Sequence, residues 1–540
     1  CEVFMRSFFA LVLFFACCLY AQVEFPLGSR IVNVTKDPYK AKADGKTDDT
    51  KAIQQALNDH PDGDYIIYLP HGIYRITDSL SWPVTDKPET SARRTILQGQ
   101  SMGGTIIQLD NLAEGFGDPE NPKALINTGT GIGKNIRNSI RDISIRTGKK
   151  NPGAIGIRFN ASNQGTISNV KLYSSDSSGV YGIDMGFNED IGPLMLKNVE
   201  ILGFETGIYA KGAKNSVTME HVTLGGQTKY GLENVNMNMA IRGLRFKGAA
   251  PAVMNRGKHA IMSILDATFE YDPGKKKHQK LTGIINESHL FARSVKVSKY
   301  NTMIRSIKKG EVESFTNTEI IEFSTQASTQ LCHSPKESMH LPIAETPNFA
   351  EQKADGWVTI VGDYGAKGNA EADDAKAIQD AIDDGAETIY FPQGRKWTIN
   401  RDVYIRNRVR RILGIEGRIE GKGKFIVEKG AFNELTIERF SEFGAGIIQK
   451  STRSILLKNM MVKSLETDEF GTGDFFMEDV SIGNIQMNHQ KLWARQLSMI
   501  GDSKAAKISN NGGTIWILGL TAKQGNTILH NFKKDSTELI

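Results

Sequence analysis

The stretch Ala43 to Leu57, ADGKTDDTKAIQQAL, returns later in the chain as GNAEADDAKAIQDAI at Gly368 to Ile382. In both copies an acidic pair, Asp48-Asp49 or Asp373-Asp374, precedes apolar residues at helical spacing. Carboxylates at a helix N-terminus accept hydrogen bonds from the free N–H groups of the first turn and complement the helix dipole. The repeat therefore predicts two short helices, each capped by its acidic pair, in two domains of one ancestry.

Both copies continue alike, with a strand that a Pro-x-Gly turn stops. Ile66 to Leu69 precede Pro70, and Thr388 to Phe391 precede Pro392. We predict a first domain over 22–333, a linker over 334–355 that contains three prolines, and a second domain over 356–540. The abrupt, apolar end at Ile540 suggests that the last repeat of the second domain is truncated.

A train of short strands follows each opening. Each strand begins with a quartet in the order polar or Gly, apolar, any, apolar, and period-2 alternation is typical of strands with one buried face. In the first domain the quartets recur every twenty-odd residues, which predicts a solenoid whose inward aliphatic side chains stack from turn to turn. They begin at Asp142, Asn169, Asn198, His221 and Gly243 in the first domain and at Asp479, Gln496 and Thr514 in the second.

The composition indicates a folded protein with no special affinity for nucleic acid. Of the 540 residues, 39% are hydrophobic and 24% are charged, and the net charge of +5 is spread along the chain. A nucleic-acid partner would require a concentrated basic face.

The N-terminus predicts a signal peptide over residues 1–21, with residues 1–4 preceding the initiator Met5. Phe8 to Leu19 form an apolar segment that is too short to span a bilayer comfortably. Removal of this segment leaves Cys332 as the last cysteine, so no intrachain disulfide is expected. We expect a monomeric protein that is secreted or periplasmic, without a membrane span.

These motifs resemble the pectate-lyase superfamily. The opening "ADGKTDDTKAIQQAL…YLPHGIYRIT" and its second copy are similar to twin-helix enzymes of glycoside hydrolase family 55, which are exo-acting β-1,3-glucanases, and to secreted bacterial relatives. The resemblance implies an all-β fold of two tandem right-handed parallel β-helices, each opened by a short capping helix. It also implies a polysaccharide substrate. The same fold carries lyases, hydrolases, epimerases and tailspikes, so the reaction does not follow from it.

The family's functional residues match this chain only in part. Asn163-Gln164-Gly165-Thr166 resembles the segment whose Gln positions the nucleophilic water, so Gln164 is the matched residue. The Ser of a Gly-rich turn is replaced by a stretch that contains Glu189 and Asp190. Lys523 and Gln524 stand where the resemblance implies a Glu-His pair with the general acid.

Two alternatives to a hydrolase remain open. A polysaccharide lyase of the calcium type would use clustered carboxylates, which Asp176, Asp184, Glu189 and Asp190 could supply. A non-catalytic glycan-binding protein is favoured by the missing acid. Calcium is expected only for the lyase, and no other cofactor is expected.

We expect the glycan to bind in a groove between the two β-helices. A hydrolase with its acid and base on different domains would hold the two carboxyl groups about 6.5–9.5 Å apart if it inverts. The candidate catalytic residues are Gln164, Asp184, Glu189 and Asp190 in the first domain and Asp468, Glu469 and Asp474 in the second.

Overall fold

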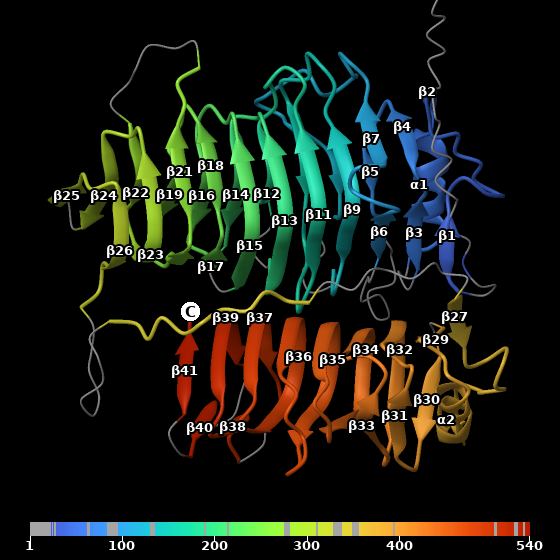
Figure 1. Cartoon of the computed structure of the whole chain (residues 1–540). Helices are drawn as coiled ribbons and strands as arrows, with labels where there is room; N and C mark the ends of the chain where they lie inside the picture. Colours follow the sequence, from blue (N-terminus) through green and yellow to red (C-terminus); the bar gives the residue numbers. More distant parts are fainter. Residues whose placement is uncertain are drawn as a thin grey trace, which may run out of the picture.

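The computed structural model describes Val23, Phe25 and residues 29–61, 65–83, 95–129, 135–187, 191–212, 215–274, 281–308, 311–327, 337–347, 356–392, 395–501, 505–522, 527–532 and 535–540. The predicted signal peptide, Cys332, Lys523 and Gln524 lie outside these residues. Two stacks of short strands lie one above the other in Figure 1. The all-β, twin parallel β-helix fold is confirmed.

The first β-helix contains one nine-residue helix, α1 (Thr50–Asn58), and strands β1 to β26. The strands are β1 (Ile31–Asn33), β2 (Asp44–Asp48), β3 (Ile66–Leu69), β4 (Gly72–Ile76), β5 (Leu80–Ser81), β6 (Ile96–Gly99), β7 (Thr105–Leu109), β8 (Lys123–Asn127), β9 (Ser139–Arg146), β10 (Ala154–Arg158), β11 (Thr166–Tyr173), β12 (Tyr181–Met185), β13 (Leu194–Leu202), β14 (Thr206–Lys211), β15 (Ser216–Gly225), β16 (Tyr230–Val235), β17 (Asn238–Arg242), β18 (Arg245–Gly248), β19 (Val253–Arg256), β20 (Ile261–Leu265), β21 (Thr268–Tyr271), β22 (Thr282–Asn286), β23 (His289–Ser298), β24 (Thr302–Lys308), β25 (Glu311–Phe315) and β26 (Glu319–Ser324).

The second β-helix contains α2 (Ala375–Asp383), also nine residues long, and strands β27 to β41. The strands are β27 (Trp357–Thr359), β28 (Asn369–Asp373), β29 (Thr388–Phe391), β30 (Lys396–Ile399), β31 (Val403–Asn407), β32 (Arg411–Gly421), β33 (Lys424–Gly430), β34 (Glu434–Gln449), β35 (Ser454–Thr467), β36 (Phe475–Asn488), β37 (Lys491–Met499), β38 (Ile508–Asn511), β39 (Thr514–Ala522), β40 (Leu529–Asn531) and β41 (Ser536–Leu539).

The long strands bend at a corner and so belong to two faces of a coil. The first half of β9 pairs with β6 and its second half with β7, and β15 divides in the same way between β17 and β18. Except in the quartet at Thr514, the corner residue is the first residue of the predicted quartet, and its backbone is left-handed, with φ of 57° at Asp142 and 53° at Asn198. Asn and Asp tolerate this conformation better than most residues, which explains the polar start of each quartet.

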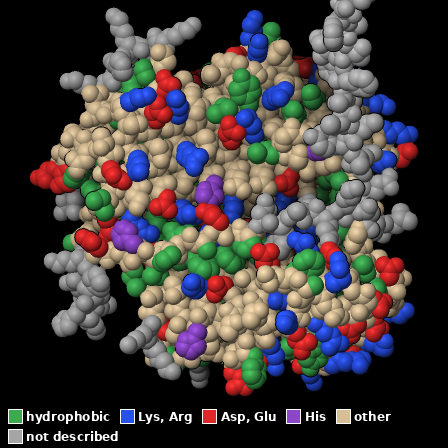
Figure 2. Space-filling view, in the orientation of Figure 1, with side chains coloured by type: hydrophobic (Ala, Val, Ile, Leu, Met, Phe, Trp, Pro, Cys, Tyr) green, Lys and Arg blue, Asp and Glu red, His purple; other side chains and the backbone are tan. Residues whose placement is uncertain are grey.

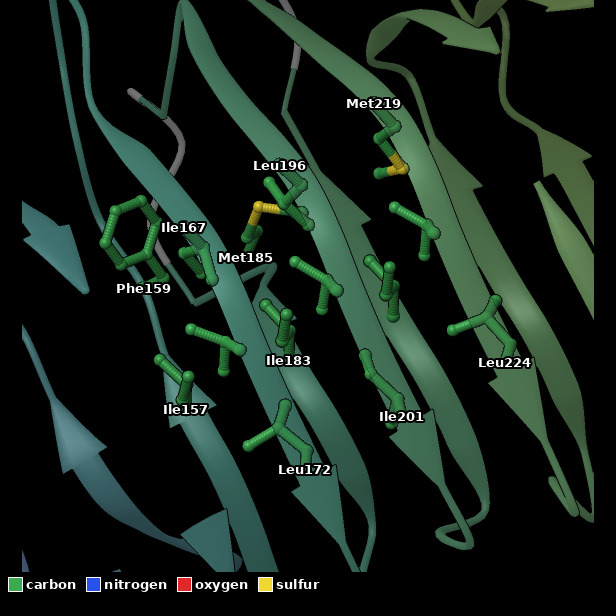
Figure 3. Close-up of a cluster of buried hydrophobic side chains, with 14 of the residues drawn as sticks. Ile157, Phe159, Ile167, Leu172, Ile183, Met185, Leu196, Ile201, Met219 and Leu224 are labelled. Atoms are coloured by element: carbon green, nitrogen blue, oxygen red, sulfur yellow. The ribbon is translucent and has the colours of Figure 1, made fainter. Parts of the chain in front are cut away.

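Inward side chains stack from coil to coil in register and form the core. Ile167, Leu196 and Met219 are neighbours on β11, β13 and β15, and all three are fully buried. Figure 3 shows this packing between successive strands. Because each buried aliphatic side chain contributes roughly 1.5–3 kcal/mol, a long stack can stabilise a coil that has no disulfide. The two β-helices have separate cores of this kind.

The acidic pairs do not cap the helices in the way that the sequence predicts. Asp49 occupies the N-cap position, but its side chain makes no capping hydrogen bond. Its two oxygens instead accept from the backbone N–H groups of Lys42 and Ala43, at 2.7 and 2.9 Å. Asp374 makes the equivalent pair of bonds in the second copy. Asp48 accepts from the N–H of Thr50, so the exposed member of this pair is the one that caps.

Both β-helices begin at the same end of the molecule, where α1 and α2 lie (Figure 1). Residues 337–347, in the connection between them, lie along the line where the two stacks meet (Figure 1). At the other end, β25 and β26 pair antiparallel with β24 and β23 and close the first stack. Among the described residues, no helix is long and apolar enough to cross a membrane.

Candidate functional site

The two β-helices meet along a contact that we call the seam. The most extensive contacts join β13, β15 and β17 of the first β-helix to β37 and β39 of the second, and further hydrogen bonds reach β35 and β36. The residues that lie at the seam are the corner residues and their neighbours on both stacks. Polar side chains therefore dominate its hydrogen bonds.

One part of the seam surrounds Gln164. Its amide nitrogen donates to the backbone oxygens of Met460 and Asp479, at 3.1 and 2.6 Å, and its amide oxygen accepts from Arg137 at 3.3 Å. The side chain is only 3% exposed. Gln164 thus lies between the two β-helices, and both ends of its amide group bond to protein atoms.

The carboxyl group of Asp479 lies beside Gln164. Its Oδ2 accepts from the hydroxyl of Thr166 at 2.9 Å and from the amide of Asn459 at 3.1 Å. Burial raises the pKa of Asp479 to about 6, against the opposing effect of Arg137. The side chain is therefore a carboxylic acid that exchanges its proton close to neutral pH.

A second cluster lies further along the seam and is fully charge-paired. Glu220 accepts from Arg495 at 3.0 Å and from Arg242 at 2.8 Å, and Lys197 Nζ lies 3.1 Å from it. Lys197 also bonds to Glu478 of the second β-helix. Burial alone would raise the pKa of Glu478, but the charges of Lys197 and Lys458 hold it well below its usual range.

Residues 337–347, which we call the strap, lie in the seam itself. Arg495 donates to the backbone oxygen of Ala344 at 2.6 Å, and Trp493 donates to that of Pro342 at 2.9 Å. Leu341, Ile343 and Ala344 pack on a hydrophobic cluster shared by the two β-helices. Figure 2 shows hydrophobic side chains gathered along this line. The groove in which we expect a glycan is thus filled by the chain over the length of the strap.

A polar cavity of about 230 Å³ lies in the seam where the strap ends. Lys197 and His221 contribute to its wall from the first β-helix, Glu478 and Lys458 from the second, and Glu345 from the strap. Thr166 and Asn459, the hydrogen-bond partners of Asp479, line it too. The wall therefore holds two carboxylates, Glu345 and Glu478, and lies next to the protonatable Asp479.

Opposite pKa shifts on neighbouring residues are the arrangement that acid–base chemistry needs. Glu478 remains a carboxylate that can hold a water molecule by accepting its hydrogen bond, whereas Asp479 can carry a proton at mildly acidic pH. Pairs of titratable groups whose environments separate their pKa values mark acid and base roles in enzymes.

The same region contains a set of potential metal ligands that does not fit a metal. One ligand atom each of Glu220, His221 and Glu345 lies within 4.8 Å of the others. Glu220, however, is already neutralised by Arg495, Arg242 and Lys197, so a divalent cation would be repelled by three positive charges.

The calcium ligands expected for a lyase are also engaged or undescribed. Asp176 accepts from the N–H of Lys150 and from Ser178, and Asp184 pairs with Arg158 at 3.0 Å. Glu189 and Asp190 lie outside the described residues. The described carboxylates of this group therefore bond to protein partners.

Asp184 does not lie at the seam. It is on β12 of the ten-stranded sheet, whereas the seam uses strands of the other two sheets. It accepts from the N–H of Gly186 at 2.8 Å in addition to its bond with Arg158, and burial raises its pKa.

The acidic group of the second β-helix forms its own loop. Asp468 accepts from the N–H groups of Phe470 and Gly471 and lies 3.4 Å from Lys450. Asp474 accepts from the N–H of Lys491, and Glu469 is exposed. These contacts are all within the second β-helix, and the described contacts do not join this loop to Gln164 or Asp184.

Glu478 and Asp479 were not among the candidates from the sequence, although a signal for them was present. Asp479 opens one of the predicted quartets and is therefore a corner residue, with φ of 51°. The residue before a corner points into the seam, as Lys197, Glu220 and Arg495 do as well. The sequence marks these positions by their place before and at the start of a quartet, but it does not say which faces of the two stacks meet.

The family model that matches the chain is described as rhamnogalacturonase A/epimerase, pectate lyase-like, and it covers residues 31–271. The first β-helix is pectate-lyase-like. This chain is 29% identical to a glucan 1,3-beta-glucosidase of Cochliobolus carbonum over 121 residues, which is 22% of its own length. It is 31% identical over 125 residues to a probable glucan endo-1,3-beta-glucosidase of Arthroderma benhamiae. The matched segments span only 14% and 12% of these two relatives.

Solved structures with a similar arrangement include two carbohydrate-active proteins. The catalytic unit of a GH87 alpha-1,3-glucanase from Streptomyces thermodiastaticus has a TM-score of 0.31 and 14% identity, with 96% of this chain and 71% of that one covered. The A-module of a mannuronan C-5 epimerase from Azotobacter vinelandii has a TM-score of 0.27 and 12% identity, with 94% and 99% covered.

Proposed function

We propose that this pectate-lyase-like protein is an exported glycoside hydrolase that cleaves a polysaccharide at the seam cavity. The observation that carries the proposal is the pair Glu478 and Asp479, whose pKa values are shifted in opposite directions beside one cavity. The matches to two glucan 1,3-beta-glucosidases support a glucan as substrate. The predicted signal peptide supports export.

In this proposal Asp479 is the general acid and Glu478 positions the water. Hydrolysis needs a proton on the leaving glycosidic oxygen and a base or water holder on the opposite side of the sugar. Asp479 does not line the cavity itself, but the hydroxyl of Thr166 does and donates to Oδ2 of Asp479; in the proposed step this hydroxyl takes the proton of Asp479 and passes its own to the glycosidic oxygen. Lys197 holds Glu478 in its charged form, and Gln164 fixes the backbone at Asp479.

The test is release of reducing ends from laminarin and from polygalacturonate by the full chain. We expect Glu478→Gln and Asp479→Asn each to lower the rate on laminarin at least about a hundredfold, the size of effect that general acid–base groups supply. The matched control is Glu420→Gln, an exposed carboxylate whose ionic partner Lys396 is on the same β-helix. Thermal unfolding of each variant separates loss of chemistry from loss of fold.

Other outcomes would reassign the function. Unsaturated products from polygalacturonate, seen by their ultraviolet absorbance, would identify a lyase. If Asp184→Asn, Asp468→Asn, Glu469→Gln or Asp474→Asn abolished activity while the two seam variants retained it, the catalytic site would lie on those residues. A folded protein that binds glucan without cleaving it would overturn the hydrolase proposal.

A further inference from the structure

The second halves of the long strands form a face of the first β-helix that lies beyond the corner residues. The second half of β9 pairs with β7 on one side and with β11 on the other, and β11 pairs in turn with β13. Figure 1 shows these strands side by side in the first stack. Thr166 and Lys197 reach the seam from the first halves of their strands, on the other side of each corner. We call the surface of β7 and of the second halves of β9, β11 and β13 the lateral face.

Four outward side chains lie in register across the lateral face, one on each strand. In strand order they are Gln108, Arg146, Tyr173 and Leu202. The residue before each of them points into the core and is fully buried, namely Ile107, Ile145, Leu172 and Ile201. The alternation of buried and outward residues thus places these four side chains next to one another on the surface.

A cavity of about 350 Å³ lies over this row. All four members of the row line it, together with Ser144, Lys171 and Ser175. Ligand cavities in proteins measure about 300–1,000 Å³, so this one is at the small end of the range and fits a compact ligand. The four strands span roughly 14 Å, since neighbouring strands lie about 4.8 Å apart.

The cavity contains a positive charge that the protein does not neutralise. Arg146 is half-buried, and it has no hydrogen-bond or ion-pair partner among the described residues. Lys171 is paired with Glu200 at 3.0 Å. Asp110 and Asp176, which follow β7 and β11 in the chain, are bonded to other groups of the protein. A guanidinium group binds a carboxylate through two parallel hydrogen bonds, so Arg146 favours a ligand with one carboxylate.

The remaining wall offers an apolar platform and two hydrogen-bond acceptors. The side chain of Tyr173 is 39% exposed, and its ring stacks on no other aromatic ring in the part of the chain that the structure describes. Leu202 extends this platform on the next strand. The hydroxyl of Ser144 donates to the oxygen of Met102 at 2.6 Å, and the amide nitrogen of Gln108 donates to the backbone at 3.0 Å. The oxygens of both side chains can therefore accept hydrogen bonds from a ligand.

We propose that this cavity binds a compact ligand that carries one carboxylate on a ring. The carboxylate pairs with Arg146, the flat side of the ring packs on Tyr173 and Leu202, and hydroxyl groups of the ligand donate to Gln108 and Ser144. A uronic acid and an aromatic acid share this chemistry. A nucleic acid would require many unpaired cations, whereas this cavity has one. The site is separate from the proposed hydrolytic site and does not depend on it.

The test is isothermal titration calorimetry of the full chain with four small ligands. Galacturonate and para-hydroxybenzoate supply the carboxylate from the two sources, and galactose and para-hydroxybenzyl alcohol are their neutral counterparts. We expect at least one of the two acids to bind at a single site. Its neutral counterpart should bind at least about tenfold more weakly, which is the size of a hydrogen bond to a charged group. The acid that binds identifies the source of the carboxylate.

Substitutions locate the binding. Arg146→Gln should weaken binding of the acid roughly ten- to a hundredfold. Tyr173→Ala should weaken it roughly three- to tenfold, whereas Tyr173→Phe, which keeps the ring, should bind as the native protein does. Arg245→Gln is the matched control, because Arg245 is an exposed arginine of the same sheet that also has no partner within the described ranges and does not line the cavity.

The possible results separate this proposal from the hydrolytic one. Absence of binding by both acids would overturn the site, as would equal binding of an acid and its neutral counterpart. Native affinity for the acid in Arg146→Gln and Tyr173→Ala proteins that keep the native melting temperature would also overturn it. The Glu478→Gln protein should bind the acid as the native protein does, so a loss of laminarin cleavage in that variant leaves this site unaffected.

Discussion

At the scale of single residues, Asp49 and Asp374 hold the loop that leads into each capping helix. Each carboxylate is buried and accepts two backbone N–H groups that lie six and seven residues earlier in the chain. The sequence showed that these acids are structural, because they precede a helix in both copies. It did not show which backbone groups they bind, because a cap and a loop clamp require the same residue at the same place.

Asp49→Ala should lower the free energy of unfolding by about 1–3 kcal/mol, because two backbone N–H groups lose the buried carboxylate that accepts from them. Asp48→Ala should cost about 1 kcal/mol or less, since its carboxylate is exposed and caps a single N–H group. Denaturant unfolding of the two variants measures both. An equal loss of unfolding free energy in the two variants would contradict the role of Asp49 in holding the loop. Both variants should cleave laminarin at the native rate.

At the scale of the secondary-structure elements, the corner residues decide where a strand bends. The quartet pattern predicted the strands and their stacking, because period-2 alternation and a repeat of twenty-odd residues follow directly from burial of one face. It did not predict that the first residue of a quartet continues the strand around a bend. The left-handed backbone at this residue depends on how the whole coil turns around the core, and no single segment of the sequence specifies that.

Ser294 allows a test of such a corner at an exposed position. Its φ is 54° and its side chain is exposed. Ser294→Val should destabilise the protein by about 1–2 kcal/mol, because a β-branched residue is strained in the left-handed region, whereas Ser294→Gly should be neutral or stabilising. Lys296→Val, an exposed change two residues along the same strand, is the control. Melting temperatures that do not distinguish Val from Gly at residue 294 would show that the bend is not set by this residue.

At the scale of the whole molecule, complementary charges align the two stacks. Lys197 and Glu220, on successive coils of the first β-helix, bond to Glu478 and Arg495, on successive coils of the second. Gln164, which the resemblance singled out as a candidate, lies in this seam, where its amide bonds to Met460 and Asp479. The partners across the seam could not be predicted, because their complementarity appears only when the faces and the register of both stacks are known. The strap also lies in the seam. It fills the groove between the two β-helices, which the sequence analysis predicts to be open.

The protonation of Asp479 should make the association of the two stacks depend on pH. Burial raises the pKa of Asp479 from 3.8 to about 6 in the folded protein, so the folded state binds this proton more tightly than the unfolded chain does. The resulting stability is fully present below pH 3.8, and it is lost as the pH rises through about 6. A shift of this size corresponds to a loss on the order of 3 kcal/mol.

Asp479→Asn keeps an uncharged side chain at every pH. Urea unfolding from pH 4 to pH 7 should therefore show the variant similar to the native protein at pH 4 and more stable at pH 7. The charged pairs Lys197–Glu478 and Arg495–Glu220 are present in both proteins, so their own pH dependence cancels in the comparison. If the two unfolding curves stayed parallel over this range, Asp479 would titrate normally, and it could not serve as the proton donor in the seam cavity.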